Sequence, residues 1–229
     1  MNTRGLLDQL LKSGQALLDK QAGGTGKPGT TAGLGSLLSG AGGGALAAGA
    51  MGLLLGNKKA RKFGGKALTY GGLAALGVLA YKAYGNWQAR QGDASHREPQ
   101  TLDRVPPAQA EQHSQAVLQA LVAAAKADGH IDDRERELIE GEFTRLDNDR
   151  QLQHWLHAEL NKPLDPAEVA RAAQTPEMAA EMYLASVMMV DQEHFMERAY
   201  LDELARQLCL DPALRQSLEE QVRQVGEAG

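Results

Sequence analysis

The stretch "LVAAAKADGHIDDRERELIEGEF", residues 121–143, has a counterpart in "YLASVMMVDQEHFMERAYLDELA", residues 183–205. Each copy begins with small and apolar residues at helical spacing, passes through an aspartate and a short polar loop, and continues in a segment that opens with Glu-Arg. Asp128 in the first copy corresponds to Asp191 in the second. The duplication predicts two helix–loop–helix units and therefore an all-α domain.

The residues around the duplication also carry helical patterns, and strand-like alternation is absent from them. Turn and stop signals divide this region: Asp-Gly at 128–129, Pro163, Thr-Pro at 175–176 and Asp-Pro at 211–212. We therefore expect a compact domain of about seven short helices, over residues 107–127, 133–147, 149–161, 166–173, 176–190, 195–208 and 212–225.

Charge and glycine are distributed unequally along the 229 residues. Residues 1–100 hold 12 Lys and Arg against 4 Asp and Glu, a net charge of +8, and 22 of the 26 glycines. Residues 101–229 hold 12 Lys and Arg against 25 Asp and Glu, a net charge of −13. This asymmetry predicts a basic, glycine-rich segment joined to an acidic globular domain. The acidic domain would repel phosphates, so we expect no nucleic-acid partner.

The most apolar part of the first half, residues 34–55, contains "SGAGGGALAAGAMGLLL" and no charged residue. As a helix, these 22 residues would be about 33 Å long, close to the ~30 Å core of a bilayer. Glycines at seven-residue intervals would form a stripe where helices approach closely in lipid and self-associate, namely Gly35, Gly42, Gly49 and Gly56. Such a glycine-rich helix is costly in water, so a disordered linker is the alternative.

A second apolar run, "ALTYGGLAALGVLAY" at residues 67–81, is short for a membrane span, but Tyr84 and Trp87 follow it as interfacial residues would. The stretch "NKKARKFGGK", residues 57–66, separates the two runs and contributes five basic residues. A single span would leave the acidic domain on the same side as this basic stretch, whereas two spans would place them on opposite sides. The positive-inside rule orients spans but does not count them, so both topologies stay open.

These patterns divide the chain into four parts. An amphipathic N-terminal segment, residues 1–32, carries leucines at helical spacing and either packs on another surface or lies on a membrane. The glycine-rich hydrophobic segment, a membrane helix or hairpin, covers residues 33–84. A polar linker over residues 85–106 precedes the helical domain, residues 107–229.

The stretch "AKADGHIDDRERELI" within the first copy resembles the signature of the TerB-like superfamily, named for a tellurite-resistance protein. The second copy, together with the glycine-rich N-terminal half, is similar to the YebE family of bacterial inner-membrane-associated proteins. The resemblance implies a compact all-α fold, acidic loops proposed to hold divalent metal, a link to envelope stress and an absence of catalytic activity. By analogy, it also implies that the acidic domain faces the cytoplasm.

Carboxylates gather at the two loops of the duplication and offer the oxygen ligands that Ca²⁺ or Mg²⁺ prefers. The candidate metal ligands are Asp128, Asp132, Glu135, Asp191, Glu193 and Glu197. The alternative is helix capping without metal, because Asp132-x-x-Glu135 has the spacing of a capping box. The second loop also lacks the glycine of the first, with Gln192 in place of Gly129.

Other reactive side chains give weaker signals. His154 and His157 share a helix face but have no third ligand in evident reach, and the single cysteine, Cys209, is expected to be a buried, inert thiol.

Taken together, these patterns and the resemblance lead us to expect a non-enzymatic, membrane-tethered domain. We expect it to bind a protein partner or a divalent cation and to be linked to envelope or metal stress. The alternative is a soluble, acidic metal-binding module whose N-terminal half is disordered.

Overall fold

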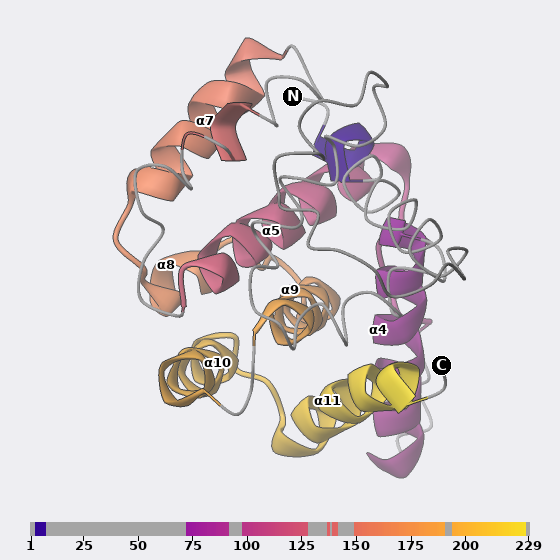
Figure 1. Cartoon of the computed structure of the whole chain (residues 1–229). Helices are drawn as coiled ribbons and strands as arrows, with labels where there is room; N and C mark the ends of the chain where they lie inside the picture. Colours follow the sequence, from indigo (N-terminus) through magenta and orange to yellow (C-terminus); the bar gives the residue numbers. More distant parts are fainter. Residues whose placement is uncertain are drawn as a thin grey trace, which may run out of the picture.

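The computed structural model describes residues 3–7, 72–91, 98–127, 137, 139–141, 149–190 and 194–227. Every regular element within these residues is helical, which confirms the predicted all-α class. Short helical pieces occur at residues 3–7 and 139–141. The longer helices in Figure 1 are α4 (Gly72–Gln91), α5 (Pro107–Ala125), α7 (Arg150–Asn161), α8 (Pro166–Ala170), α9 (Pro176–Met189), α10 (Phe195–Gln207) and α11 (Pro212–Glu227).

Helix α9 forms the centre of the fold. Eleven of its 14 residues are buried, and Met182 is fully enclosed. Figure 1 views α9 nearly along its axis, with α5, α10, α11 and α4 arranged around it. A helix that is apolar on all sides has to be covered on all sides, so the remaining helices form its shell.

Helices α5 and α9 cross at an angle, since Figure 1 views α9 nearly end-on and α5 from the side, but their contacts follow the same sense along both helices. His113 of α5 contacts Glu181 of α9, and further along both helices the Ser186 hydroxyl donates to the Ala120 carbonyl at 3.5 Å. Because the two contacts follow the same order along both helices, the C-terminal ends of α5 and α9 lie at the same end of the pair. Ala127 and Val190, which precede the two acidic stretches in the sequence, therefore lie toward this end.

Local capping sets the starts of the helices. Proline occupies the first turn of α5, α8 and α9, where its missing N–H costs no hydrogen bond. Side chains that precede helices accept their first N–H groups: Asp149 from Leu152, Asp165 from Ala167 and Thr175 from Met178. These signals confirm the helices predicted over 107–127, 149–161, 176–190, 195–208 and 212–225, with small shifts at their ends.

Helix α8 is shorter than predicted, since it ends at Ala170 rather than at residue 173. Residues 171–173 continue as a tight turn, in which Ala172 N–H donates to the Val169 carbonyl and Ala173 N–H to the Ala170 carbonyl. Thr175 must adopt an extended conformation to cap α9 and precede Pro176, so α8 cannot continue into it. Most of the predicted helix over 133–147 lies outside the described residues, although residues 139–141 are helical.

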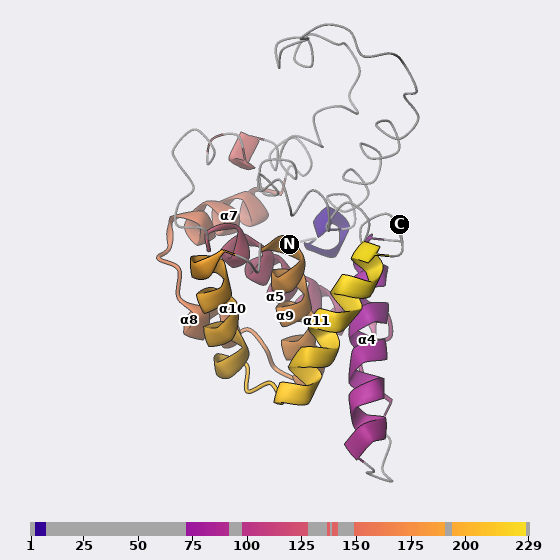
Figure 2. The same cartoon turned by 60° about the horizontal axis from the view of Figure 1, so that its bottom comes forward.

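Helix α4 belongs to the folded domain, which differs from the expectation that residues 33–84 are membrane-associated and that 85–106 are a linker. It packs on α9 and α11, and Figure 2 shows α4 and α11 side by side. One face of α4 is buried, comprising Leu76, Ala80, Ala83 and Tyr84. This stripe has helical spacing and runs past the end of the apolar run at Tyr81, so the domain includes residues 72–91.

Trp87, which the sequence suggested as an interfacial residue, joins α4 to α11 instead. Its indole N–H donates to Asp211 Oδ1 at 3.0 Å. The same carboxylate caps α11 by accepting from Ala213 N–H at 2.8 Å, and that bond holds the pKa of Asp211 below its ordinary value. A single aspartate therefore fixes both the start of α11 and its position against α4.

Helix α4 also packs closely on the turn at residues 101–105. Asp103 lies directly over Gly77, and the Arg104 guanidinium stacks 3.9 Å from the centre of the Tyr81 ring. The approach is close because Gly77 has no Cβ.

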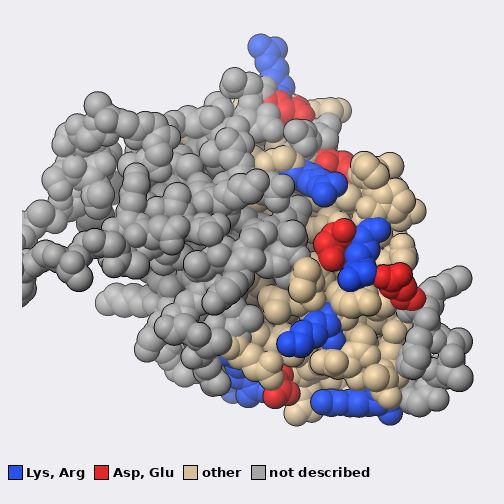
Figure 3. All heavy atoms as spheres, turned by 90° about the vertical axis from the view of Figure 1, so that its right-hand side faces the viewer, with Lys and Arg blue, Asp and Glu red and all other residues tan. Residues whose placement is uncertain are grey.

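No helix among the described residues combines the length and apolarity needed to cross a membrane. On the side of the molecule where α4 lies, positive and negative side chains of the described residues are interspersed among uncharged ones (Figure 3). The glycine stripe at Gly35, Gly42, Gly49 and Gly56 lies outside the described residues.

Helix α10 ends in a Schellman turn at the single cysteine. Leu210 N–H donates to the Ala205 carbonyl and Cys209 N–H to the Arg206 carbonyl, while Cys209 adopts φ 52°. Cys209 is exposed, so the expectation of a buried thiol was wrong. The reason is local, because the left-handed residue of this turn projects away from the helix that it ends.

We expect Gly77→Ala to destabilise the domain by about 1–2 kcal/mol, which is the overpacking cost less the better helix propensity of alanine. The added Cβ would lie 2.7 Å from Asp103 Oδ1 and 3.0 Å from its backbone nitrogen. Gly85→Ala on the same helix is the matched control, since no described atom lies within 4 Å of its Cβ position, and it should stabilise by about 0.5–1 kcal/mol. Urea unfolding measures both, and shifts of the same sign would contradict the close packing at Gly77.

Cys209→Gly should stabilise the domain by about 1 kcal/mol, because glycine adopts the left-handed conformation without the steric cost of a Cβ. Cys209→Ala keeps the Cβ and should give no comparable gain. Thermal unfolding of the two variants under reducing conditions tests this, and equal melting temperatures would count against backbone strain at Cys209.

Candidate functional site

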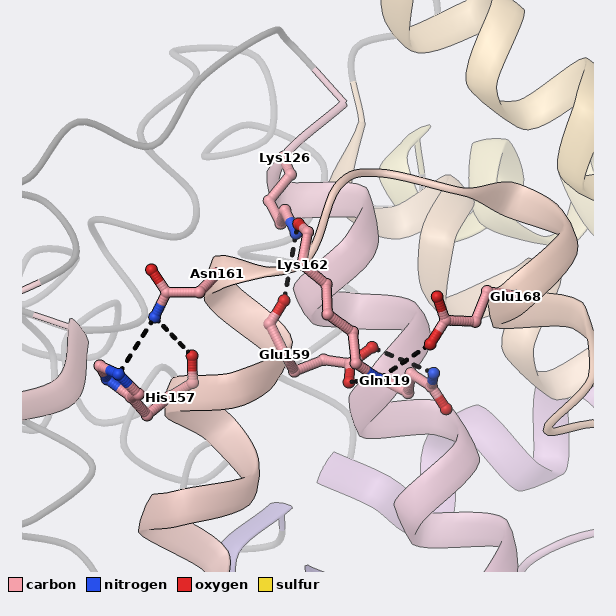
Figure 4. A network of polar contacts seen from close by, with 7 residues as sticks. All are labelled: Gln119, Lys126, His157, Glu159, Asn161, Lys162 and Glu168. Atoms are coloured by element: carbon pink, nitrogen blue, oxygen red, sulfur yellow. Dashed lines mark hydrogen bonds and ion pairs between the residues drawn. The ribbon is translucent and has the colours of Figure 1, made fainter.

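A cluster of polar side chains joins α5, α7 and α8 next to the point where the first acidic stretch begins (Figure 4). We call it the α5–α7 cluster, and its members are Gln119, Lys126, Glu159, Lys162 and Glu168.

Lys126 connects the end of α5 with the end of α7. It is the C-cap residue of α5, and its ammonium group donates to the backbone carbonyl oxygens of Glu159, at 3.1 Å, and of Lys162. Carbonyls at a helix C-terminus have no partner within the helix and carry partial negative charge. Lys126 therefore caps α7 from a neighbouring helix.

Glu159 is a buried carboxylate with partners on both oxygens. Oε1 accepts from the Gln119 amide at 3.0 Å, and Oε2 pairs with the Lys162 ammonium at 2.9 Å. A buried charge is tolerated only when it is paired and hydrogen-bonded, so these contacts hold α7 in register against α5.

Lys162 is the second positive charge of the cluster. Its hydrogen bond to Glu168, at 2.8 Å, is the main cause of a pKa above the ordinary lysine value, and the bond to Glu159 adds to it. A raised pKa keeps the amine protonated, whereas a nucleophilic lysine needs a lowered one. The two lysines and two glutamates thus balance one another, and the cluster is suited to positioning rather than to reaction.

A small pocket opens beside the cluster, between the ends of α5 and α7 and the start of α8. Ala123, Leu164 and Val169 form its apolar part, and Lys126 and Lys162 form part of its rim. Both ammonium groups already bind carbonyls or carboxylates, so a ligand here would have to displace those contacts.

His157 attaches the residues after the first acidic stretch to the same helix. Its Nδ1 lies 2.7 Å from Glu140 Oε1, and its carbonyl accepts from the Asn161 amide at 2.7 Å (Figure 4 shows the second contact). The predicted companion, His154, is exposed. Helix α7 therefore holds both flanks of the first acidic stretch, through Lys126 before it and through Glu140 after it.

Of the six predicted metal ligands, the structure describes Glu197. This residue is buried in the first turn of α10, with Oε1 3.8 Å from His194 Nδ1. The other five lie outside the described residues, namely Asp128, Asp132, Glu135, Asp191 and Glu193. Within the described part of the chain, no three His, Cys, Asp or Glu side chains are grouped so as to hold a metal ion.

Sequence reasoning missed the residues that organise this region. Lys126 lies inside the motif itself, where it interrupts an apolar helix just before its end, and a lysine in that position is a known C-terminal signal. Glu159 gave no comparable signal, because its burial depends on contacts with a helix 40 residues away.

We expect Lys126→Met to destabilise the domain by about 1–3 kcal/mol, because it leaves carbonyls at the end of α7 without their charged donor. Lys82→Met is the matched control, since it removes the same charge from an exposed position on α4. Urea unfolding gives the energies, and amide exchange at the end of α7 locates the effect. Equal stability of the two variants would contradict the capping role.

Two comparisons with known proteins match this chain. An uncharacterized protein in the ampR 5′ region of Yersinia enterocolitica is 36% identical over 127 residues, which are 56% of this chain and 90% of that protein. No solved structure matches the chain significantly. The profile of the family described as "Protein of unknown function (DUF533)" matches residues 40–222, which include α4 to α10 and most of α11, and the chain therefore belongs to the DUF533 family.

Proposed function

We propose that this chain is a non-enzymatic binding module in which a TerB-like helical domain takes up a divalent cation, Ca²⁺ or Mg²⁺, at its two acidic loops. In this proposal the glycine-rich segment tethers the domain to lipid at the bacterial inner membrane, and the domain faces the cytoplasm and acts in envelope or metal stress. The observation that carries the cation site is the common end of α5 and α9, from which both acidic stretches start.

Electrostatics support a cation at this end. The C-terminal ends of α5 and α9 each carry partial negative charge, and the acidic stretches add carboxylates to the same region. Concentrated negative charge destabilises a compact fold, and a bound divalent cation relieves it. The α5–α7 cluster and the His157–Glu140 contact supply the rigid support that a binding loop requires.

The absence of catalysis is supported by how the described charged groups are used. The buried carboxylates Glu159 and Glu181 accept hydrogen bonds from neighbouring helices or turns, and Lys162 is held protonated. These groups are committed to positioning helices, so they resemble structural ion pairs more than a reaction centre.

A protein partner is the second candidate, and one observation favours it. Phe195 and Met196 are adjacent at the start of α10, and are 79% and 53% exposed. Large apolar side chains exposed next to each other are typical of binding surfaces. Their position directly after the second acidic stretch would allow cation binding and partner binding to influence each other.

A titration of the full chain with CaCl₂ or MgCl₂, monitored by thermal unfolding, tests the cation site. At about 100 times the dissociation constant, binding should add about 2.7 kcal/mol, which corresponds to roughly 2–4 °C for each kcal/mol in a domain of this size. Asp128→Asn and Asp191→Asn should reduce the shift, whereas Glu220→Gln, an equal charge loss on the exposed face of α11, should retain it. A melting temperature that responds to neither cation would refute the site and leave the protein-partner function.

A further inference from the structure

The first described residues of the chain, 3–7, are docked on the helical domain beside the start of α5 (Figure 1). The backbone N–H groups of Thr3 and Arg4 donate to the two oxygens of Glu111, at 2.6 Å and 3.2 Å. Leu6 and Leu7 are 1% and 0% exposed and belong to the same buried cluster as the core helices. We call residues 3–7 the N-terminal clasp.

The clasp has the chemistry of a short peptide ligand. Thr3, Leu6 and Leu7 have the spacing of one helix face and are buried, whereas Arg4 is exposed. The first N–H groups of a helix have no helical partners, and the Glu111 carboxylate accepts from them and suits the positive end of the helix. Five residues are too few for a helix that persists alone in water, so the structure of the clasp depends on its docking site.

Helix α5, which carries the docking site, is held in place by other contacts as well. Two residues after Glu111, His113 contacts the buried Glu181 of α9, and at the far end of α5 Lys126 donates to carbonyl oxygens of α7. The site therefore keeps its position when the clasp leaves. An empty site would present a carboxylate that has lost two donors, beside apolar surface that the two leucines had covered.

We propose that this docking site also accepts the clasp of a second copy of the chain, so that two copies associate by exchanging residues 3–7. An exchanged clasp makes the same contacts as in one copy, because the ligand and the site are both unchanged. Concentration therefore decides between the two arrangements. Neither the cation site nor the membrane tether is needed for this exchange.

The position of the clasp in the chain favours the exchange. The clasp ends at Leu7 and the next described residue is Gly72, so 64 residues, 8–71, connect them. Most connections within compact domains have a median length of about 4–6 residues. A covalent connection favours the clasp of the same copy, but this advantage falls as the connecting chain lengthens. A second copy at high local concentration therefore competes for the site.

The contacts also define how each partner can be disabled. A positive charge in place of Glu111 removes the acceptor and repels the positive end of the clasp helix. Charged side chains in place of Leu6 and Leu7 would have to be buried without partners, which is costly. One substitution therefore disables the site, and the other disables the clasp.

Hydrogen exchange of the purified full chain in mild detergent tests the docking. The amides of Thr3 and Arg4 should be protected, and Glu111→Lys should speed their exchange by tenfold or more. Glu111→Gln retains one acceptor oxygen and should give an intermediate rate. Gln112→Ala changes the exposed neighbouring position and should leave the protection intact. Unprotected amides in the unmodified chain would overturn the docking site.

Two complementary full-length variants test the exchange. The Glu111→Lys chain offers a clasp but no site, and the Leu6→Asp, Leu7→Asp chain offers a site but no clasp. The first chain carries a fluorescent label on the exposed Cys209, and its sedimentation is followed at the wavelength of the label. An equimolar mixture should sediment faster than either chain alone. Adding Leu6→Asp and Leu7→Asp to the labelled chain should abolish this increase.

Two results would contradict the exchange. One is a mixture that sediments as the separate chains do, which would mean that the site takes only the clasp of its own copy. The other is a complex that persists when neither chain has a clasp, since its interface would then lie elsewhere. Circular dichroism checks that the Leu6→Asp, Leu7→Asp chain remains helical, and Leu6→Ala, Leu7→Ala replaces it if it does not.

Discussion

The buried carboxylate of Glu181 sets the register of the fold. It lies on the central helix α9 with no exposed surface, and it is held by His113 Nδ1 at 2.6 Å and by the Leu102 N–H at 2.5 Å. An unpaired charge in this position would be very costly, so α5, α9 and the turn at residues 101–105 have to stay together. Since Asp103 of that turn lies over Gly77, the position of α4 follows from the same contact.

This carboxylate specifies position more than it stabilises. Burial raises the pKa of Glu181, although the hydrogen bond with His113 opposes the rise. A raised pKa means that the folded state binds the proton more tightly than the unfolded state does. The contribution of Glu181 to stability is therefore greatest in acid and is lost as the pH rises through the raised pKa. At neutral pH the Glu181 carboxylate therefore lowers the free energy of unfolding relative to acid. Its contacts nevertheless fix one arrangement of α5, α9 and the turn at residues 101–105.

The parts of this fold that the sequence predicts are those governed by local contacts. The Thr175-Pro176 pair marks a helix start because cap and helix are neighbours in the chain. The assignment of α4 depends instead on distant partners, since Trp87 binds Asp211, 124 residues away. The apolar run at residues 67–81 is short for a membrane span, and it was the aromatic residues after it that suggested a membrane interface. The buried stripe on α4 can be interpreted only once its contacts with α9 and α11 are known. The α5–α7 cluster is likewise beyond sequence reasoning, because it requires the register of two helices, while most candidate metal ligands lie outside the described residues.

Helix α5 holds two other segments of the chain, one at each of its ends. Glu111 lies in its first turns and accepts hydrogen bonds from the backbone N–H groups of Thr3 and Arg4. Lys126 is its C-cap residue, 15 residues later, which at about 1.5 Å per residue is about 22 Å. The Lys126 ammonium donates to carbonyl oxygens at the end of α7. Both contacts join a charged side chain of α5 to backbone groups at a helix end, where those groups have no helical partner. One helix therefore positions residues 3–7 and helix α7 by the same kind of interaction, used once with a carboxylate and once with an ammonium group.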